Sequence, residues 1–324
     1  MGNKKREQLL ALFSEKRGEF ISGEQMASFL GCSRTAVWKY MSALRKEGFI
    51  IEAVRNKGYR LEASTDQFSK DAISLGLKTK LIGQELTVLN VVESTQQVAH
   101  LAVSNGACSG AVIIADEQKG GKGRLKRSWD SQKGQGIWMS IILKPDIPLQ
   151  KVPQFTFIAS LAVTEAITQL TNLKAEIKWP NDVYIGKRKV CGVLTEMQAD
   201  AESVHAVILG IGVNVNQVEF PDELVNKATS LKQELGTKVS RRKVIQAILF
   251  YLEKYYLLFI EQGFAPIKIL WEERALSFGK TLRVTTMQEK ITGVALGISD
   301  TGVLLVQDDT GKIHHIYSAD IEMN

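Results

Sequence analysis

The hydrophobic periodicity of this chain changes twice, near residue 65 and near residue 277. Helical spacing dominates the first segment, strands and helices alternate in the second, and short strands of alternating character fill the third. At 324 residues the chain is long enough for two or three domains, each with its own hydrophobic core. We therefore expect an α+β multidomain fold with domains at 1–64, 65–276 and 277–324.

The first segment has the pattern of a helix-turn-helix followed by a hairpin. Ser22 and Gln25 have the spacing of a capping box at the start of one helix, and Gly31 suits the left-handed position that ends it. A second helix is expected over 33–49. Two short strands about a turn follow within 50–63, so the segment is expected to form a winged helix-turn-helix.

Basic charge is concentrated in this first segment. Residues 1–64 hold 12 Lys and Arg against 7 Asp and Glu, whereas the rest of the chain holds 29 against 28. Such an imbalance favours a polyanionic partner, and DNA fits the predicted fold. The side chains expected to contact DNA are Arg34, Thr35, Lys39, Arg55 and Lys57. Arg60 is expected at the hairpin tip, the direction of Trp38 stays open, and a module that binds protein is the alternative.

Several classes of protein do not fit the composition. No apolar run approaches the roughly 20 residues that a membrane helix needs, and the N-terminus lacks the apolar block of a signal peptide. The three cysteines are far apart, and the four histidines form no ligand pattern. We therefore expect a cytoplasmic protein without a disulfide or a zinc site, and with no membrane partner.

A glycine-rich basic loop, QKGGKGRLKRSW at 118–129, follows an apolar strand. Glycines let the backbone approach an anion closely, and clustered Lys and Arg side chains neutralise phosphate or carboxylate. Trp129 can stack on a planar base or close a pocket. The loop is not a P-loop, because Gly123 rather than Ser or Thr follows Lys122. A solvated basic turn is the alternative.

Shorter motifs can add polar groups to such a site. Ser94 and Thr95 follow an apolar strand and can receive a polar ligand or cap the next helix. The stretch 177–197 is expected to form a hairpin with its turn near Gly186. Within it Asp182 can bind a metal, orient a cation or bond its own backbone, and Lys189 can clamp an anion or stay solvated. In the stretch GIGVNVN at 210–216 the glycines can allow close backbone approach and Asn214 can bind a ligand edge, or the stretch is a strand end with a bulge.

Taken in order, ESTQQ, DEQKGGKGRLKRSW, KWPNDV, KVCG and GIGVNVN resemble the motifs of the biotin protein ligases. With the winged helix in front, the chain resembles their bifunctional subgroup, whose members also repress the biotin operon. The resemblance spans essentially the whole chain. It implies a winged helix-turn-helix, a class II synthetase-like catalytic domain and a C-terminal SH3-like barrel.

The resemblance also implies an activity. Biotin and ATP, with Mg²⁺, would form biotinyl-5′-AMP, and biotin would then pass to a lysine of a biotin carboxyl carrier protein. Biotinyl-5′-AMP would favour a homodimer that binds operator DNA and represses genes of biotin synthesis and transport.

The resemblance assigns roles to individual residues as well. The catalytic residues would be Lys189, Arg124 and Asp182. Biotin would be bound by Ser94, Thr95, Gln96, Gln118, Lys122, Gly123, Arg124 and Lys189. The adenylate would contact Arg124, Arg127, Trp129 and Asn214, and no protein side chain is assigned to a metal.

The sequence departs from the family pattern in three places. Lys122 replaces the first arginine of the family loop, which keeps the charge without the bidentate fork. Leu125 and Lys126 stand where a small residue or glycine is common. The segment YSADI at 317–321 stands where S-G-E or S-G-D is common, so its contribution is open.

Three alternatives remain at this point. A lipoate–protein ligase has a related fold and the same acyl-adenylate chemistry. A ligand-sensing winged-helix regulator without ligase activity would bind DNA and release no pyrophosphate. A winged helix with a structural role alone would leave ligase activity without operator binding.

Overall fold

The computed structural model describes residues 3–16, 18–46, 49–61, 68–201, 203–286 and 289–323. The chain forms two compact units, residues 1–78 and 79–324. The domain boundary expected near residue 65 lies outside the described residues. Helix α4 (Lys70–Ser74), which the sequence pattern assigns to the second domain, belongs to the first unit, because its Ala72 is buried in that unit's core.

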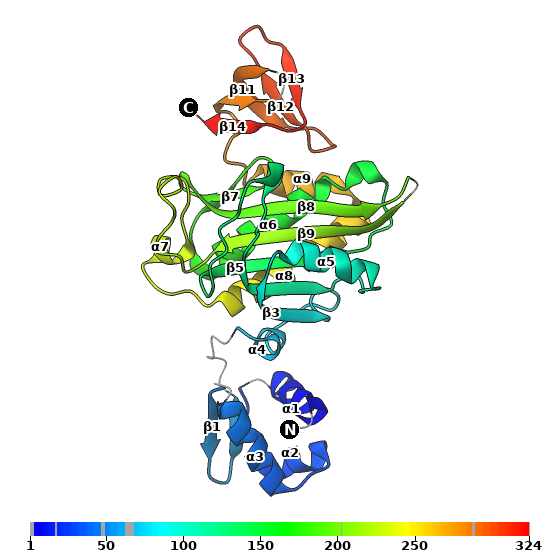
Figure 1. Cartoon of the computed structure of the whole chain (residues 1–324), viewed down its shortest axis with the longest axis vertical. Coiled ribbons are helices and arrows are strands. Elements are labelled where there is room, and N and C mark those ends of the chain that lie inside the picture. Colours follow the sequence, from blue (N-terminus) through cyan, green and yellow to red (C-terminus); the bar gives the residue numbers. More distant parts are fainter. Residues whose placement is uncertain are drawn as a thin grey trace. The chain divides into compact units, whose positions relative to one another are not determined.

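The first unit is a winged helix-turn-helix, drawn in blue in Figure 1. Its elements are α1 (Asn3–Glu15), α2 (Gly23–Leu30), α3 (Arg34–Lys46), β1 (Ile51–Val54) and β2 (Gly58–Leu61). The strands pair in antiparallel fashion, as the hairpin pattern predicts. The helices share an apolar core that includes Leu9, Phe13, Met26, Leu30, Val37, Met41 and Leu44.

Local chemistry explains where these elements begin and end. The Ser22 hydroxyl accepts from Gln25 N at 3.1 Å, and Ser22 N donates to Gln25 Oε1 at 3.0 Å, which confirms the predicted capping box. Gly31 ends α2 in the left-handed conformation, with φ 57°. At Gly58 a β-carbon would lie 2.1 Å from the Ile21 carbonyl oxygen, so only glycine lets the wing approach α2 this closely.

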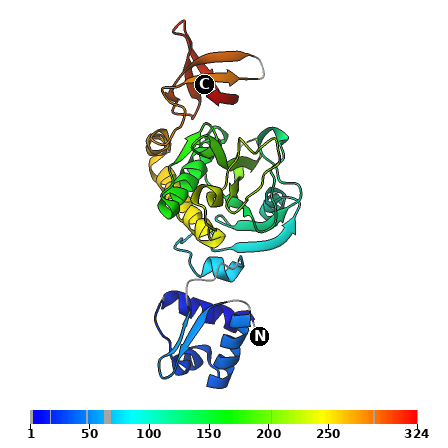
Figure 2. The same cartoon turned by 90° about the vertical axis from the view of Figure 1, so that its left-hand side faces the viewer.

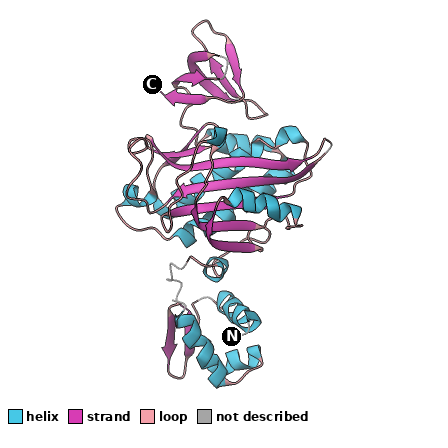
Figure 3. Ribbon diagram, in the orientation of Figure 1, coloured by secondary structure: helices cyan, strands magenta, loops and turns pink. Residues whose placement is uncertain are grey.

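The second unit is built on a seven-stranded sheet, shown in magenta in Figure 3. Its strands are β3 (Leu86–Val92), β4 (Val112–Gln118), β5 (Gly136–Leu143), β6 (Ala175–Lys178), β7 (Asp182–Ile185), β8 (Arg188–Ala199) and β9 (Val204–Asn214). They lie in the order β3-β4-β5-β9-β8-β7-β6, with only the β3–β4 pair parallel. The expected hairpin turn near Gly186 is confirmed between β7 and β8.

Helices cover both faces of this sheet. The long helices α6 (Gln154–Thr171) and α8 (Arg241–Gln262) lie together on one side, as Figure 2 shows in green and yellow. Helix α5 (Thr95–Ser104) packs Ala99 and Val103 against the other face, on Ile113, Ile142 and Ile208. Helix α8 ends at Gly263, and α9 (Phe264–Glu272) follows directly.

Short elements complete this part of the unit. They are η1 (Arg124–Lys126), η2 (Leu149–Lys151) and α7 (Leu231–Leu235). Within the described residues, no helix combines the length and the apolar character needed to cross a membrane.

A buried carboxylate fixes the start of the second unit. Glu253 on α8 accepts from the backbone N–H groups of Lys80, Leu81 and Ile82, each at 2.7 Å. Glu253 is 8% exposed. Three donors are thereby satisfied by one side chain that lies more than 170 residues further along the chain, so the segment is held without regular secondary structure.

The last strands form a separate antiparallel sheet in the order β13-β12-β11-β10-β14. Their bounds are β10 (Thr281–Thr285), β11 (Lys290–Ile298), β12 (Leu304–Gln307), β13 (Ile313–Ile316) and β14 (Asp320–Met323). Inward side chains alternate along them, and Leu282, Val284, Leu304 and Val306 are fully buried. The small antiparallel module expected from residue 277 is confirmed.

Candidate active site

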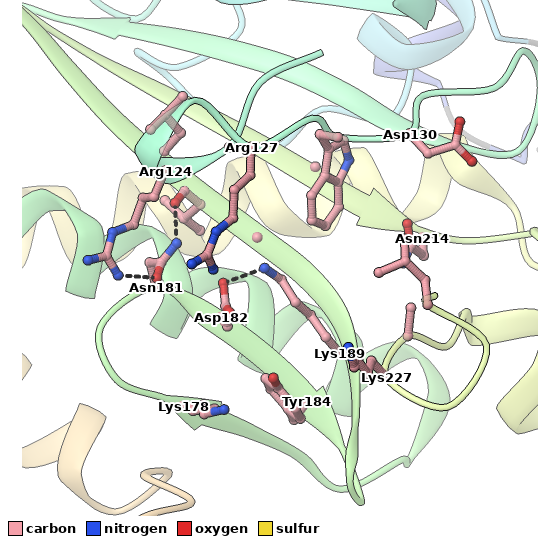
Figure 4. Close-up of a pocket in the computed structure, with 18 of the residues that line it drawn as sticks. Arg124, Arg127, Asp130, Lys178, Asn181, Asp182, Tyr184, Lys189, Asn214 and Lys227 are labelled. Atoms are coloured by element: carbon pink, nitrogen blue, oxygen red, sulfur yellow. Dashed lines mark hydrogen bonds and ion pairs between the residues drawn. The ribbon is translucent and has the colours of Figure 1, made fainter. Parts of the chain in front are cut away.

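A cavity of about 940 Å³ opens on the α5 side of the seven-stranded sheet. It is lined from five stretches of sequence, within 94–96, 118–139, 178–194, 210–228 and 276–322. All the residues that the sequence assigns to catalysis, biotin or adenylate line this one cavity. Figure 4 shows part of it, with charged side chains from the loop, β7 and β8 directed toward one another.

Hydroxyl and amide groups form a fixed cluster in the cavity wall. Thr95 donates from its backbone N and its Oγ1 to Gln118 Oε1, at 2.9 and 3.1 Å. Gln118 Nε2 donates to Ser131 Oγ at 2.9 Å, so both ends of its amide are oriented. Ser94 is 3% exposed at the start of α5 but makes no capping hydrogen bond. The capping alternative therefore does not account for Ser94.

Glycines make a floor without side chains under this cluster. Gly192 on β8 pairs with Gly212 on β9, and the Trp129 indole lies over both. A β-carbon would lie 2.5 Å from Trp129 Nε1 at Gly212, and 3.0 Å from its Cζ3 at Gly192. At Gly210 a β-carbon would lie 3.0 Å from Gln96 Cδ, so the missing side chain leaves space for Gln96 in the same way. The glycines expected to allow close approach thus admit two of the protein's own side chains.

An ion pair lies beside the floor. Lys189 Nζ is 2.7 Å from Asp182 Oδ1 and 5.1 Å from the centre of the Trp129 ring. Asp182 is thus paired with a cation, which is one of the three roles considered for it. Burial raises the pKa of the neighbouring Tyr184 phenol well above its usual range, and the Asp182 charge adds to this.

The loop arginines connect the cavity to the C-terminal module. Arg124 donates to Asn181 Oδ1 at 3.0 Å and to Ser318 Oγ at 2.9 Å. Arg127 Nη2 lies 2.5 Å from Asp320 Oδ2. Burial lowers the pKa of Arg124, whereas the hydrogen bond that Arg127 donates to Asp320 raises the pKa of Arg127. The segment 317–321, whose contribution the sequence leaves open, thus contacts the basic loop directly.

The loop itself is a narrow turn with two strained residues. Trp129 N donates to Gly121 O at 2.9 Å, and Gly123 N donates to Arg127 O at 2.8 Å. Between these bonds Leu125 and Lys126 both have left-handed backbone, with φ 54° and 60°. Non-glycine residues rarely adopt this conformation.

Sequence reasoning missed four lysines of the cavity wall, namely Lys178, Lys187, Lys227 and Lys280. Burial lowers the pKa of Lys178, and the charge of Asp182 opposes this shift. Lys178 stands directly before the WPND motif and could have been considered with it. Lys227 lies in a loop with no recognisable pattern.

Asn214 lines the cavity with an amide that is already in use. Its Nδ2 donates to Thr229 O at 3.1 Å, and its Oδ1 accepts from Gln217 Nε2 at 3.1 Å. Its contact with an adenylate stays a prediction. Among the residues that the structure describes, no group of three or more His, Cys, Asp or Glu is placed to hold a metal ion.

The winged helix presents a basic surface of its own. The residues predicted to contact DNA are all exposed: Arg34, Thr35, Lys39, Arg55 and Lys57. A hollow of about 330 Å³ between α2, α3 and the wing is lined by Arg34 and Arg55. Trp38 is 57% exposed, so it points away from the helical core.

The expectation for Arg60 is wrong. Arg60 lies within β2 opposite Glu52 rather than at the hairpin tip. Its guanidinium binds the Glu52 carboxylate at 2.5 Å and covers the Phe20 ring at 4.6 Å. Cross-strand pairing thus uses the charge that the sequence pattern placed at the hairpin tip.

Comparisons with known families and proteins agree with this arrangement. Residues 88–214 match the biotin/lipoate A/B protein ligase family, 5–60 match an HTH domain, and 277–323 match the biotin protein ligase C terminal domain. The bifunctional ligase/repressor BirA of Bacillus subtilis is 50% identical over 320 residues, which are 98% of each chain. The Escherichia coli protein of the same description is 30% identical over 93% of this chain and 92% of its own.

Solved structures resemble the chain as well. A biotin protein ligase from Aquifex aeolicus, in complex with biotin and ATP, is 33% identical with a TM-score of 0.65. The match covers 74% of this chain and 99% of that one.

Proposed function

Because this chain belongs to the biotin/lipoate A/B protein ligase family, in its bifunctional ligase/repressor branch, we propose that it joins biotin to a protein lysine at the expense of ATP and represses transcription. The observation that carries the ligase half is the single cavity. It combines oriented amide and hydroxyl groups with several cations over a glycine floor.

In the first step a biotin carboxylate oxygen attacks the α-phosphorus of ATP. An oxygen–phosphorus bond forms, and the bond to pyrophosphate breaks. Two anions must approach each other, so positive charge near both is the main requirement. Lys189 would hold the carboxylate, and Arg124 and Arg127 would meet the phosphates once they leave Ser318 and Asp320. Lys122, Gly123 and Trp129 would cover the adenylate, with Asn214 and the oriented Gln118 amide nearby.

Mg²⁺ fits this site as a companion of the polyphosphate. Asp182 is committed to Lys189, and the residues described offer no cluster of protein ligands for the ion. Bound to the phosphates, the ion would supply charge neutralisation. The chain's own residues would bind and orient biotin and exclude water from the mixed anhydride.

In the second step the ε-amine of an acceptor lysine attacks the acyl carbon of biotinyl-5′-AMP. An amide forms, AMP leaves and the amine gives up a proton. We propose a biotin carboxyl carrier protein as the acceptor. The loop 118–129 would protect the adenylate until that protein arrives.

The first experiment is biotin-dependent ATP–pyrophosphate exchange with Mg²⁺, with lipoate and octanoate as parallel substrates. Exchange with biotin alone supports the adenylating half-reaction and excludes a lipoate ligase. Exchange with none of the three acids overturns the ligase proposal and leaves a ligand-sensing regulator.

Repression would depend on a dimer formed through β3. This strand ends the sheet order, and no described strand pairs with its outer side. The other end, β6, is partly covered, since Ile177 forms backbone hydrogen bonds with Arg274 and Leu276. The basic loop leaves the end of β4 and bonds to the end of β3, where Lys119 N donates to Val92 O at 2.9 Å and Gly120 N to Glu93 O at 2.8 Å. Ordering the loop over biotinyl-5′-AMP would therefore stabilise the edge that a second subunit needs.

Sedimentation with and without biotin plus ATP tests this coupling, and a dimerisation constant insensitive to the ligands would refute it. DNA binding is tested with Arg34→Ala and Lys39→Ala, and the Arg60→Ala variant serves as the basic-residue control. Unchanged transcription in the first two variants would leave the winged helix a structural role.

We also propose the division into domains at 1–64, 65–276 and 277–324, which the matched ranges support. Helix α4 is the exception, because it packs in the core of the first unit. The cytoplasm is the proposed location. The three cysteines, Cys32, Cys108 and Cys191, are all free thiols, which suits a reducing compartment.

A further inference from the structure

A chain of polar side chains runs from the surface to the cavity between α5 and β8. Gln96 and His100 are four residues apart on α5, and Glu196 and Gln198 are two apart on β8. The helix rises about 6 Å over four residues and a strand about 6.8 Å over two, so the two pairs are in register. Gln96 bonds Glu196, and His100 bonds both Glu196 and Gln198.

The donor and the acceptor of each hydrogen bond among these four side chains follow from the groups that they contact. Gln198 Nε2 donates to the His100 backbone oxygen at 2.9 Å, which identifies this end as the amino group. The same nitrogen lies 3.2 Å from His100 Nδ1, so Nδ1 accepts and Nε2 carries the proton. His100 Nε2 then donates to Glu196 Oε2 at 3.0 Å.

The last bond fixes the amide of Gln96. Gln96 Nε2 donates to Glu196 Oε2 at 3.1 Å, and the Leu194 carbonyl oxygen lies 3.5 Å away. Both partners can only accept, so the amino group must face β8 and the carbonyl Oε1 must face away from it.

Gln96 Oε1 has no hydrogen-bond partner, although it is buried in a residue that is only 7% exposed. The side chain lies over Gly210, where a β-carbon would be 3.2 Å from Oε1, and Gln96 lines the cavity. A buried acceptor without a donor is destabilising, so its presence is best explained by a donor on the ligand.

We propose that Glu196 and His100 are positioning residues that hold Gln96 Oε1 as the acceptor for one ureido N–H group of biotin. This inference rests on the proposed ligase function. Neither residue lines the cavity, so both act through Gln96. Their arrangement selects a substrate with an N–H donor at this point and rejects one with an acceptor there.

The test is steady-state pyrophosphate exchange with the Glu196→Gln variant of the full chain. A glutamine at this position can offer either a donor or an acceptor, so it no longer fixes Gln96. We expect the KM for biotin to rise about tenfold, as for the loss of one neutral hydrogen bond. The kcat and the KM for ATP should stay unchanged. The matched control is Glu176→Gln, a strand glutamate that pairs with exposed Lys174 outside the cavity.

Two further variants separate positioning from a structural role. In a Gln96→Ala background, Glu196→Gln should have no additional effect on the KM for biotin, because the residue it positions is gone. A His100→Ala variant should show a smaller rise of the same kind. N-methylated biotin, with the methyl group on either ureido nitrogen in turn, should be discriminated less by Glu196→Gln than by the wild type.

An unchanged KM for biotin in Glu196→Gln, or additive effects in the double variant, would overturn the inference. A lower kcat, found equally when biotin or ATP is the varied substrate, would also overturn it, because it would indicate a structural role for Glu196. Absence of exchange in the wild type would instead refute the ligase function itself, so the two failures are distinguishable.

Discussion

Replacing Gly212 by alanine should disable the adenylate half of the cavity while leaving the fold intact. The new β-carbon would lie 2.5 Å from Trp129 Nε1 and 2.7 Å from its Cε2. Ordinary carbon contacts begin near 3.5 Å, so the indole must move by about 1 Å. At Gly192 the distance to the ring is 3.0 Å, which requires a shift of roughly half that. The two alanine variants therefore form a graded pair.

Overpacking of this kind costs about 1–3 kcal/mol, which corresponds to roughly 5- to 150-fold in binding. Trp129 lies on a surface loop, so its indole can move out of the cavity without disturbing the fold. The substitution should therefore weaken ligand binding rather than lower the free energy of unfolding. We expect the KM for ATP to rise at least about tenfold in Gly212→Ala and only a few-fold in Gly192→Ala, with similar thermal unfolding. Adding Trp129→Phe to Gly212→Ala should restore part of the loss. Equal effects of the two alanines, or no rescue by the smaller ring, would refute the argument.

Three other outcomes follow from contacts described above. Glu253→Gln should lower the free energy of unfolding by about 2–3 kcal/mol, because an amino group would face backbone donors; thermal denaturation beside the exposed Glu261→Gln control checks this. Asp320→Asn should change stability by less than about 1 kcal/mol, since its pair is exposed, but should speed tryptic cleavage after Arg127. Lys178 is cationic below its lowered pKa, so ATP affinity should fall with rising pH before an ordinary lysine titrates, and Lys178→Met should remove that limb of the pH profile.

The parts of the fold that sequence predicts well are those decided by neighbours in the chain. The capping box of Ser22 and Gln25, the stop at Gly31 and the turn near Gly186 involve residues a few positions apart. Their chemistry is visible in a short window. The strands β4, β5 and β9 are also predictable, because each contains a run of consecutive apolar residues.

Contacts between distant segments were beyond the same reasoning. The motifs KVCG and GIGVNVN are visible in the sequence. The pairing of their glycines across β8 and β9, and the packing of Trp129 on them, depend on three separate segments. The contact of Arg127 with Asp320 spans 193 residues, and that of His100 with Glu196 spans 96. Arg60 was misplaced for a related reason, since the register of β1 and β2 brings Glu52 opposite it. Sequence alone names such residues without their partners.

The left-handed backbone at Leu125 and Lys126 affects how easily the basic loop changes shape. Each such residue costs about 1 kcal/mol or more relative to ordinary backbone, so the conformation seen here is raised by roughly 2 kcal/mol. A rearrangement that returns both residues to common backbone angles recovers this free energy, worth about 30-fold in the equilibrium between the two loop shapes. A ligand that favours the rearranged loop therefore needs that much less differential affinity to populate it. Glycines at these two positions would remove the advantage.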